Sequence, residues 1–178
     1  MESTSNKCLK EWNATVEALG QGKQSILIRN YKTNVTEFLF YPTVSYALKN
    51  DYLDSFQTNY HDFVENNTLP EKKDDKVLIK YYATLEKITE KPVSWIPPAK
   101  YYIWTRDHIK NYMTGPSAFI WILRVYKLKE TYWAEPTPEA IKFANLKEKA
   151  SLEGMKPVLS DHVFFNLING LFDELSRK

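Results

Sequence analysis

The stretch FIWILRVYKL, residues 119–128, decides the fold class of this chain. Its opening residues are apolar without alternation, and β-branched and aromatic side chains dominate it. Such a run is typical of a strand that is buried on both faces, in the centre of a sheet or in the wall of a barrel. The chain is therefore expected to be organised around a sheet that contains this strand.

Shorter runs of the same kind predict further strands on its N-terminal side. Residues 24–31 and 37–41 are largely apolar and flank the polar residues 32–34, which predicts a strand pair with a polar connection. Residues 77–88 predict another long strand. The segment before it, residues 71–76, carries charges of both signs and is expected to be a solvated loop.

Apolar residues at three- and four-residue spacing predict the helices. The first is followed by Gly20, which suits a helix C-terminus, and the fourth starts with Thr137 as N-cap and Pro138 at its first position. The last begins at a Ser160 or Asp161 cap and carries a wide apolar stripe. The predicted helices cover residues 7–19, 49–65, 101–113, 137–150 and 161–176.

Length and element order predict one α+β domain. The 178 residues, 43% of them hydrophobic, suit one compact core, with a disordered N-terminus at residues 1–6 and a single globular domain over residues 7–178. We expect a mixed or antiparallel sheet with the N-terminal and C-terminal helices packed outside it. No apolar stretch approaches the roughly 20 residues of a membrane span, and the polar N-terminus predicts no secretion signal, so a cytoplasmic protein is expected.

Composition and motif content exclude several kinds of site. A formal net charge of +2 creates no strong field for polyanions, and a single cysteine, Cys8, excludes an intrachain disulfide and a multi-cysteine zinc site. The three histidines lie far apart, and no phosphate-binding glycine loop, nucleophile elbow or zinc-binding helix motif is present. We therefore predict no metal, no cofactor and no catalytic residue, and favour a protein that is not an enzyme.

A basic and aromatic region is the main pointer to function. Residues 99–129 contain six basic residues and one acid, interleaved with seven tyrosine, tryptophan and phenylalanine rings. Rings that stack on bases and cations that meet phosphates are what a reader of single strands or modified bases needs. The alternative, favoured for Phe119 and Trp121, is that these rings belong to the core. Arg29 and Arg124 each follow an apolar segment, and so form either buried ion pairs or a two-arginine clamp for an anion.

Successive blocks of the chain resemble an uncharacterised prokaryotic family, domain of unknown function 1802. The resemblance covers most of residues 8–172 and implies an accessory role near DNA, in a restriction or defence system. Residues 150–154, ASLEG, depart from the tryptophan-containing segment expected there. The matching blocks are LKEW (9–12), EALGQGKQ (17–24), LIR (27–29), FLFYPT (38–43), YIWT (102–105), LRVYKL (123–128) and PVLSD (157–161).

A fainter similarity is to the ASCH branch of the PUA-like folds, whose signature reads Gly-x-Lys-x-x-Glu-x-Arg. The matching octet is residues 22–29, in which Gly22 and Arg29 agree while Gln24 replaces the lysine and Leu27 the glutamate. The likeness implies a small PUA-like barrel that binds RNA or modified bases in an aromatic pocket. The carboxylate that such a site uses is missing from the octet.

We therefore predict a non-enzymatic module that binds RNA, DNA or a nucleotide-like ligand. The first alternative is a protein-interaction subunit or homodimer that uses the apolar stripe of residues 161–176. The second is a hydrolase or nuclease with Asp51, Asp54 and His61 on one helix face, although such charges more often face water. The candidate nucleic-acid-binding residues are Lys23, Arg29, Tyr102, Trp104, Arg106 and Arg124.

Overall fold

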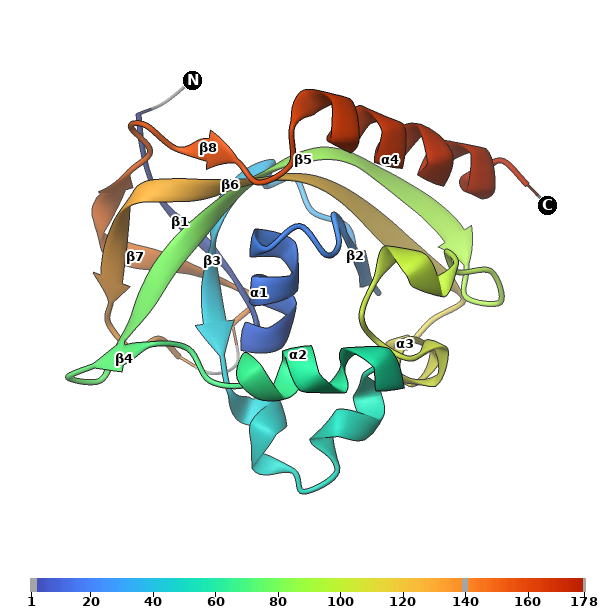
Figure 1. Ribbon diagram of the computed structural model, residues 1–178, viewed down its shortest axis with the longest axis horizontal. Coiled ribbons are helices and arrows are strands. Elements are labelled where there is room, and N and C mark those ends of the chain that lie inside the picture. Colours follow the sequence, from blue (N-terminus) through green and yellow to red (C-terminus); the bar gives the residue numbers. More distant parts are fainter. Residues whose placement is uncertain (1–2, 139–140, 178) are drawn as a thin grey trace.

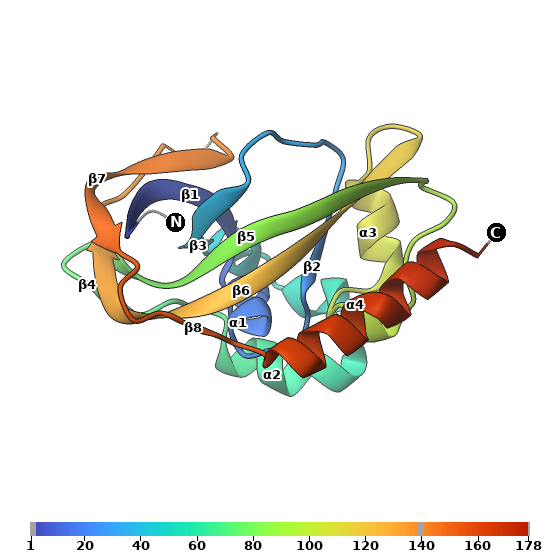
Figure 2. The ribbon, with the colours of Figure 1, turned by 90° about the horizontal axis from the view of Figure 1, so that it is seen from above.

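A long, bent antiparallel ribbon of two strands forms the centre of the molecule. The computed structural model describes residues 3–138 and 141–177. The strands of this ribbon are β5 (Lys76–Pro92) and β6 (Ser117–Ala134), and their register pairs Tyr82 with Tyr126. Figures 1 and 2 show the ribbon crossing the whole molecule. Both strands contain the predicted ones, residues 77–88 and 119–128, because their apolar runs meet each other across the ladder.

The remaining strands extend this ribbon into one mixed sheet with the order β2-β6-β5-β3-β1-β7. β1 and β3 are parallel, whereas every other described pairing is antiparallel. The two shortest strands lie off this path, β4 on β5 and β8 on β6. The α+β prediction with a mixed sheet is thereby confirmed. The additional strands are β1 (Thr4–Trp12), β2 (Ile26–Arg29), β3 (Glu37–Thr43), β4 (Lys72–Lys73), β7 (Phe143–Ser151) and β8 (Lys156–Pro157).

The described residues form four α-helices beside the sheet, and none of these helices is long and apolar enough to cross a membrane. In α4 the predicted cap is present, because Ser160 Oγ accepts a hydrogen bond from the backbone N–H of Val163 at 3.3 Å. Short 3-10 turns η1 to η4 occupy the longer connections. These elements are α1 (Asn13–Gly20), α2 (His61–Asn66), α3 (Arg106–Tyr112), α4 (Asp161–Leu175), η1 (Ser45–Leu48), η2 (Tyr52–Ser55), η3 (Thr58–Tyr60) and η4 (Ala99–Tyr101).

The helix predicted over residues 7–19 is wrong in its first half. Residues up to Trp12 form β1, which pairs with β3 on one side and β7 on the other, and only Asn13–Gly20 is helical. The strand begins at Thr4, inside the segment expected to be disordered. The apolar spacing that suggested one helix combines side chains of a strand with side chains of a helix, because pairing on both sides of β1 overrides local preference.

Three other predicted helices are also wrong in extent or type. Within residues 49–65 the chain forms η2, η3 and α2, since Phe56 adopts an extended conformation and makes a β-bridge with Trp104 that interrupts any helix. Within residues 137–150, positions 139–140 lie outside the described residues, and from Phe143 onward the chain forms β7. Its alternating burial, with Ala144 and Leu146 inside, is a strand pattern paired to β1. The helix predicted at 101–113 is confined to α3.

α1 lies in the hollow of the curved sheet, while α4 lies outside the curve (Figure 1). All eight residues of α1 are buried, so this N-terminal helix packs on the sheet and is also covered on its other side. At its end, Gly20 is so close to the Tyr81 ring that a Cβ would lie 2.2 Å from the ring carbons. A second apolar cluster contains Cys8, where burial raises the thiol pKa to about 12 and makes it inert at neutral pH.

Candidate functional site

A cleft of about 740 Å³ opens where the ends of several strands and one helix converge. We call it the Arg29 cleft. Its lining comes from the C-terminal ends of β1, β2 and β3, from α3, and from the segment between β6 and β7. At the ends of its strands the chain leaves the sheet and enters loops. Polar side chains can therefore lie there without interrupting the hydrogen bonds between strands.

A buried ion pair, Arg29 with Glu11, lines the inner part of this cleft. Both side chains are only 9% exposed, and Glu11 Oε1 also accepts the backbone N–H of Trp12 at 3.1 Å. Arg29 ends β2 and Glu11 lies on β1, and three strands separate these two in the sheet order. The curl of the sheet therefore brings them together, and each charge compensates the desolvation of the other.

Aromatic rings form the wall beside this pair. Tyr112 on α3 is 38% exposed, and its ring centroid lies 5.8 Å from the Arg29 guanidinium. Trp12 is stacked on Tyr46 with centroids 4.9 Å apart and contacts the His108 ring at 5.1 Å. Tyr112 is the most exposed ring of the described lining, so it is the ring most open to a flat ligand.

Cations outnumber carboxylates along the cleft. Lys142 Nζ lies 3.6 Å from the Tyr31 ring centroid, and Lys10 Nζ donates to the Pro138 carbonyl at 2.6 Å. Among the described residues that line the cleft, Lys10, Arg29, Lys72 and Lys142 are basic and Glu11 and Asp75 are acidic, so this described lining carries more cations than carboxylates. A pocket that combines several aromatic rings with an excess of basic side chains favours a flat, anionic ligand.

This positive field and burial also lower the pKa of His108. Burial is the larger cause, and the charges of Arg29 and Lys49 act in the same direction. The imidazole is therefore neutral near pH 7 and presents one donor and one acceptor to the cleft. Burial raises the pKa of Tyr31, an effect that Arg29 opposes, so this phenol keeps its proton at neutral pH.

Of the six predicted binding residues, the cleft contains Arg29 and Trp104. Trp104 is 4% exposed and its Nε1 donates to Thr15 Oγ1 at 3.2 Å, so it supports the wall from behind. Tyr102 is fully buried, and its hydroxyl donates to the Pro97 carbonyl at 2.8 Å. The core interpretation therefore applies to both rings.

The other three predicted residues lie elsewhere. Lys23 is exposed with Nζ 5.0 Å from the Phe63 ring, and Arg106 is exposed and donates to the Pro97 carbonyl at 3.2 Å. Arg124 donates to Asp161 Oδ1 at 2.8 Å. In the sheet register Arg29 lies opposite Phe119 of β6, and Arg124 lies five residues further along that strand. The two arginines are therefore apart. Each forms its own ion pair, and they do not make a clamp.

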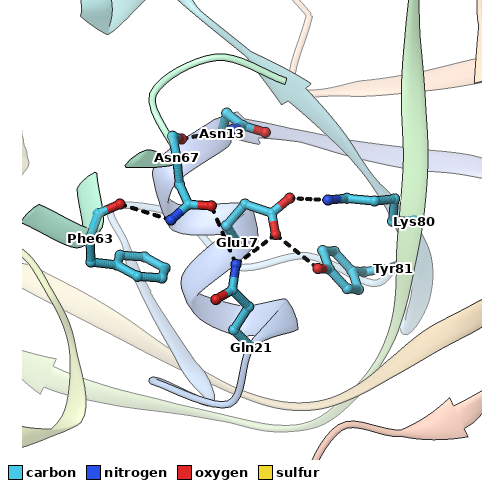
Figure 3. Close-up of polar contacts among 7 residues, drawn as sticks. All are labelled: Asn13, Glu17, Gln21, Phe63, Asn67, Lys80 and Tyr81. Atoms are coloured by element: carbon cyan, nitrogen blue, oxygen red, sulfur yellow. Dashed lines mark hydrogen bonds and ion pairs between the residues drawn. The ribbon is translucent and has the colours of Figure 1, made fainter. Parts of the chain in front are cut away.

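A second polar cluster surrounds Glu17 on α1 (Figure 3). Its carboxylate accepts from the Tyr81 hydroxyl at 2.8 Å and from Gln21 Nε2 at 3.1 Å, and pairs with Lys80 Nζ at 2.6 Å. Asn67 extends the cluster to α2 by accepting from Gln21 at 3.3 Å. Its members satisfy one another, so this cluster ties α1 to β5 and α2.

The acid and base group predicted on one helix face is not assembled. Asp51 and Asp54 are both exposed; Asp51 precedes η2 and Asp54 lies within it. His61 begins α2, and its Nε2 lies 2.9 Å from the Phe56 carbonyl oxygen. Within residues 3–138 and 141–177, no group of three or more histidine, cysteine or acidic side chains is arranged to hold a metal ion.

Sequence reasoning missed most of the cleft lining. Glu11 and Trp12 were assigned to a helix, and Tyr31, Tyr112 and Lys142 had no spacing that linked them. The sequence feature that could have pointed to this cleft was Arg29, a charged residue directly after an apolar run. Its partner could not be chosen among 22 acidic residues without the sheet order.

Comparison with known proteins identifies a family. The family model described as "Domain of unknown function (DUF1802)" matches residues 8–169. No curated protein matches the chain. The solved structure of ASCH from Zymomonas mobilis is 13% identical over 92% of this chain and 93% of its own, with a TM-score of 0.44. A single-substitution variant of that protein gives a TM-score of 0.43 at 12% identity over 92% of this chain and 96% of its own.

Proposed function

Because this chain belongs to the family described as domain of unknown function 1802, its role has to be argued from its own residues, and we propose that the Arg29 cleft binds a nucleotide or a short single strand of nucleic acid. The proposal concerns binding and assigns no catalytic residue. It is carried by one observation, the meeting of an exposed ring, a buried arginine–carboxylate pair and a lysine rim in a single cleft.

The size and the wall of the cleft suit one or two nucleotides. Its volume of about 740 Å³ falls within the roughly 300–1,000 Å³ of small-ligand sites. Tyr112 offers a partly exposed ring beside Arg29, and stacking of a base on such a ring contributes about 1–3 kcal/mol. A single-stranded or unpaired base can reach a ring in a cleft, whereas a base inside a duplex cannot.

The lysines at the rim suit the phosphates of such a ligand. Lys142 is exposed, and Lys10 and Lys72 line the same opening. The formal net charge is only +2, so attraction must come from these local contacts and the salt dependence of binding should be shallow. Each neutralised phosphate contributes a slope of about −0.7 to the plot of log affinity against log salt for single strands.

The test is binding of fluorescent single-stranded RNA, single-stranded DNA and duplex DNA across a salt series. Tyr112→Ala should weaken single-strand binding about tenfold or more through lost stacking, and Lys142→Ala should make the salt slope shallower by about 0.7. Matched controls are Trp133→Ala and Lys147→Ala, an exposed ring and an exposed lysine outside the cleft.

Each control should bind as the wild type does. The proposal fails if no single strand binds at tens of micromolar, or if the cleft variants and the control variants lose affinity equally.

A further inference from the structure

We propose that the Arg29 cleft selects guanine over the other bases through the Glu11–Arg29 pair. This inference rests on the proposed function and names the ligand of the same cleft. It starts from the chemistry of the pair, which places an acidic acceptor and a basic donor side by side in the cleft lining.

Glu11 keeps acceptor capacity after its contacts inside the protein are made. Its Oε2 pairs with Arg29 Nη2, and its Oε1 accepts the backbone N–H of Trp12 at 3.1 Å. A carboxylate has about four acceptor positions, so about two remain, one on each oxygen. Arg29 carries five N–H donors, more than its contact with Glu11 uses. The pair can therefore present one donor and two acceptors in a row.

Guanine has the complementary edge. Its Watson–Crick side presents the O6 acceptor followed by the N1–H and N2–H donors, so O6 faces the guanidinium and both N–H groups face the carboxylate. Adenine and cytosine each place a ring-nitrogen lone pair against the carboxylate, and uracil places a carbonyl oxygen there. A buried carboxylate facing a lone pair is left without a donor, which is costly. Guanine is the one common base that avoids this conflict.

The surroundings of the pair fit a bound base. The Arg29 guanidinium lies over the Tyr112 ring at 5.8 Å from its centroid, so a base that stacks on the uncovered part of that face would have its edge near the guanidinium. Lys142 and Lys10 line the same cleft, where the phosphate of that nucleotide would find positive charge. A bidentate contact with a base edge gives roughly ten- to a hundredfold discrimination against the wrong base.

The test uses the wild-type protein and uridine hexamers whose third nucleoside is guanosine, inosine, adenosine or cytidine. Inosine lacks only the N2 amino group of guanine, so a loss at inosine isolates the contact with Glu11. We expect the guanine hexamer to bind at least tenfold more tightly than the adenine and cytosine hexamers, with inosine weaker than guanine. Since only the ligand changes, the result does not depend on how a variant folds.

A protein variant gives the second arm. Glu11→Gln keeps the shape of the side chain and replaces one acceptor oxygen with an NH₂ donor, so it should abolish the preference for guanine over inosine. Thermal unfolding of this variant shows whether it still folds.

The outcomes separate the two proposals. Equal binding of all four hexamers, lost in Tyr112→Ala, overturns the guanine inference and leaves the proposed function standing. If none of the hexamers binds, the proposed function fails and the inference fails with it.

Discussion

Gly20 is the glycine at which an added Cβ would make the closest contact. A Cβ at this position would lie 2.2 Å from the Tyr81 ring, and that ring is held by the hydrogen bond from its hydroxyl to Glu17 at 2.8 Å. Gly20→Ala should therefore destabilise the protein by about 1–3 kcal/mol through overpacking, although alanine is the better helix former. Urea unfolding measures this difference.

Gly115 provides the matched control, because a Cβ there would meet no atom within 4 Å. Gly115→Ala should leave stability within about 0.5 kcal/mol of the wild type. Equal stability of the Gly20 and Gly115 variants would show that Tyr81 moves aside freely.

At the same scale, the two arginines show what single residues could predict. Both follow apolar segments, a pattern that left open a buried ion pair or an anion clamp. Arg29 forms a buried ion pair, whereas Arg124 pairs with Asp161, whose side chain is 80% exposed. The partner of Arg124, Asp161, also opens α4, so it was visible only as a helix cap. The partner of Arg29 was hidden, since Glu11 was assigned to a helix.

At the scale of elements, α4 is both part of the core and partly exposed. Leu171 is fully buried in the main core, whereas Phe165 on the same helix is 54% exposed. Leu171→Ala should cost about 2–5 kcal/mol, and Phe165→Ala should change stability by less than about 0.5 kcal/mol. Denaturant unfolding of the two variants is the measurement.

The interaction alternative is tested by the same pair of variants. If α4 only served a partner, Leu171→Ala would leave the isolated protein as stable as the wild type. A large loss shows instead that deleting residues 161–178 would unfold the domain, so a partner or dimer through this helix has to be sought with Phe165→Ala.

Helices and strands were predictable from the sequence where one hydrophobic pattern dominated a segment. The long strands around residues 77–88 and 119–128 and the capped α4 were correctly located because each carries many apolar residues in one continuous segment. β1 and β7 were mistaken for helices. In β1 the apolar spacing crosses a boundary between strand and helix at Asn13, and β7 carries charged residues that also suit a helix. Their partner strands, remote in sequence, decide their conformation.

At the scale of the whole molecule, the cleft could not have been predicted from residue spacing. Glu11, Arg29, Tyr112 and Lys142 come from four segments, and the curl of the mixed sheet brings them together. The sequence predicted the chemistry, aromatic rings among lysines and arginines, but placed it mainly in residues 99–129. Many of those rings are core residues. The residues that line the cleft come instead largely from the ends of strands that are far apart in the sequence.

The buried thiol of Cys8 and the buried phenol of Tyr46, one in each apolar cluster, predict how the free energy of unfolding depends on alkaline pH. Burial raises the pKa of Cys8 from 9.0 to about 12, and burial raises the pKa of Tyr46 from 10.0 to about 12. The unfolded chain therefore releases these protons at lower pH than the folded chain does. Their contribution to stability is complete below pH 9, and is lost as pH rises from 9 towards 12.

Each such group lowers the free energy of unfolding by up to about 1.4 kcal/mol per pH unit in that window. Urea unfolding between pH 7 and pH 11 should show a steep decline for the wild type. Cys8→Ala removes one titrating group, so its curve should fall less steeply above pH 9 while running parallel to the wild-type curve below it. Curves that stay parallel up to pH 11 would mean that water reaches the Cys8 thiol in the folded protein, and that the second apolar cluster is not sealed.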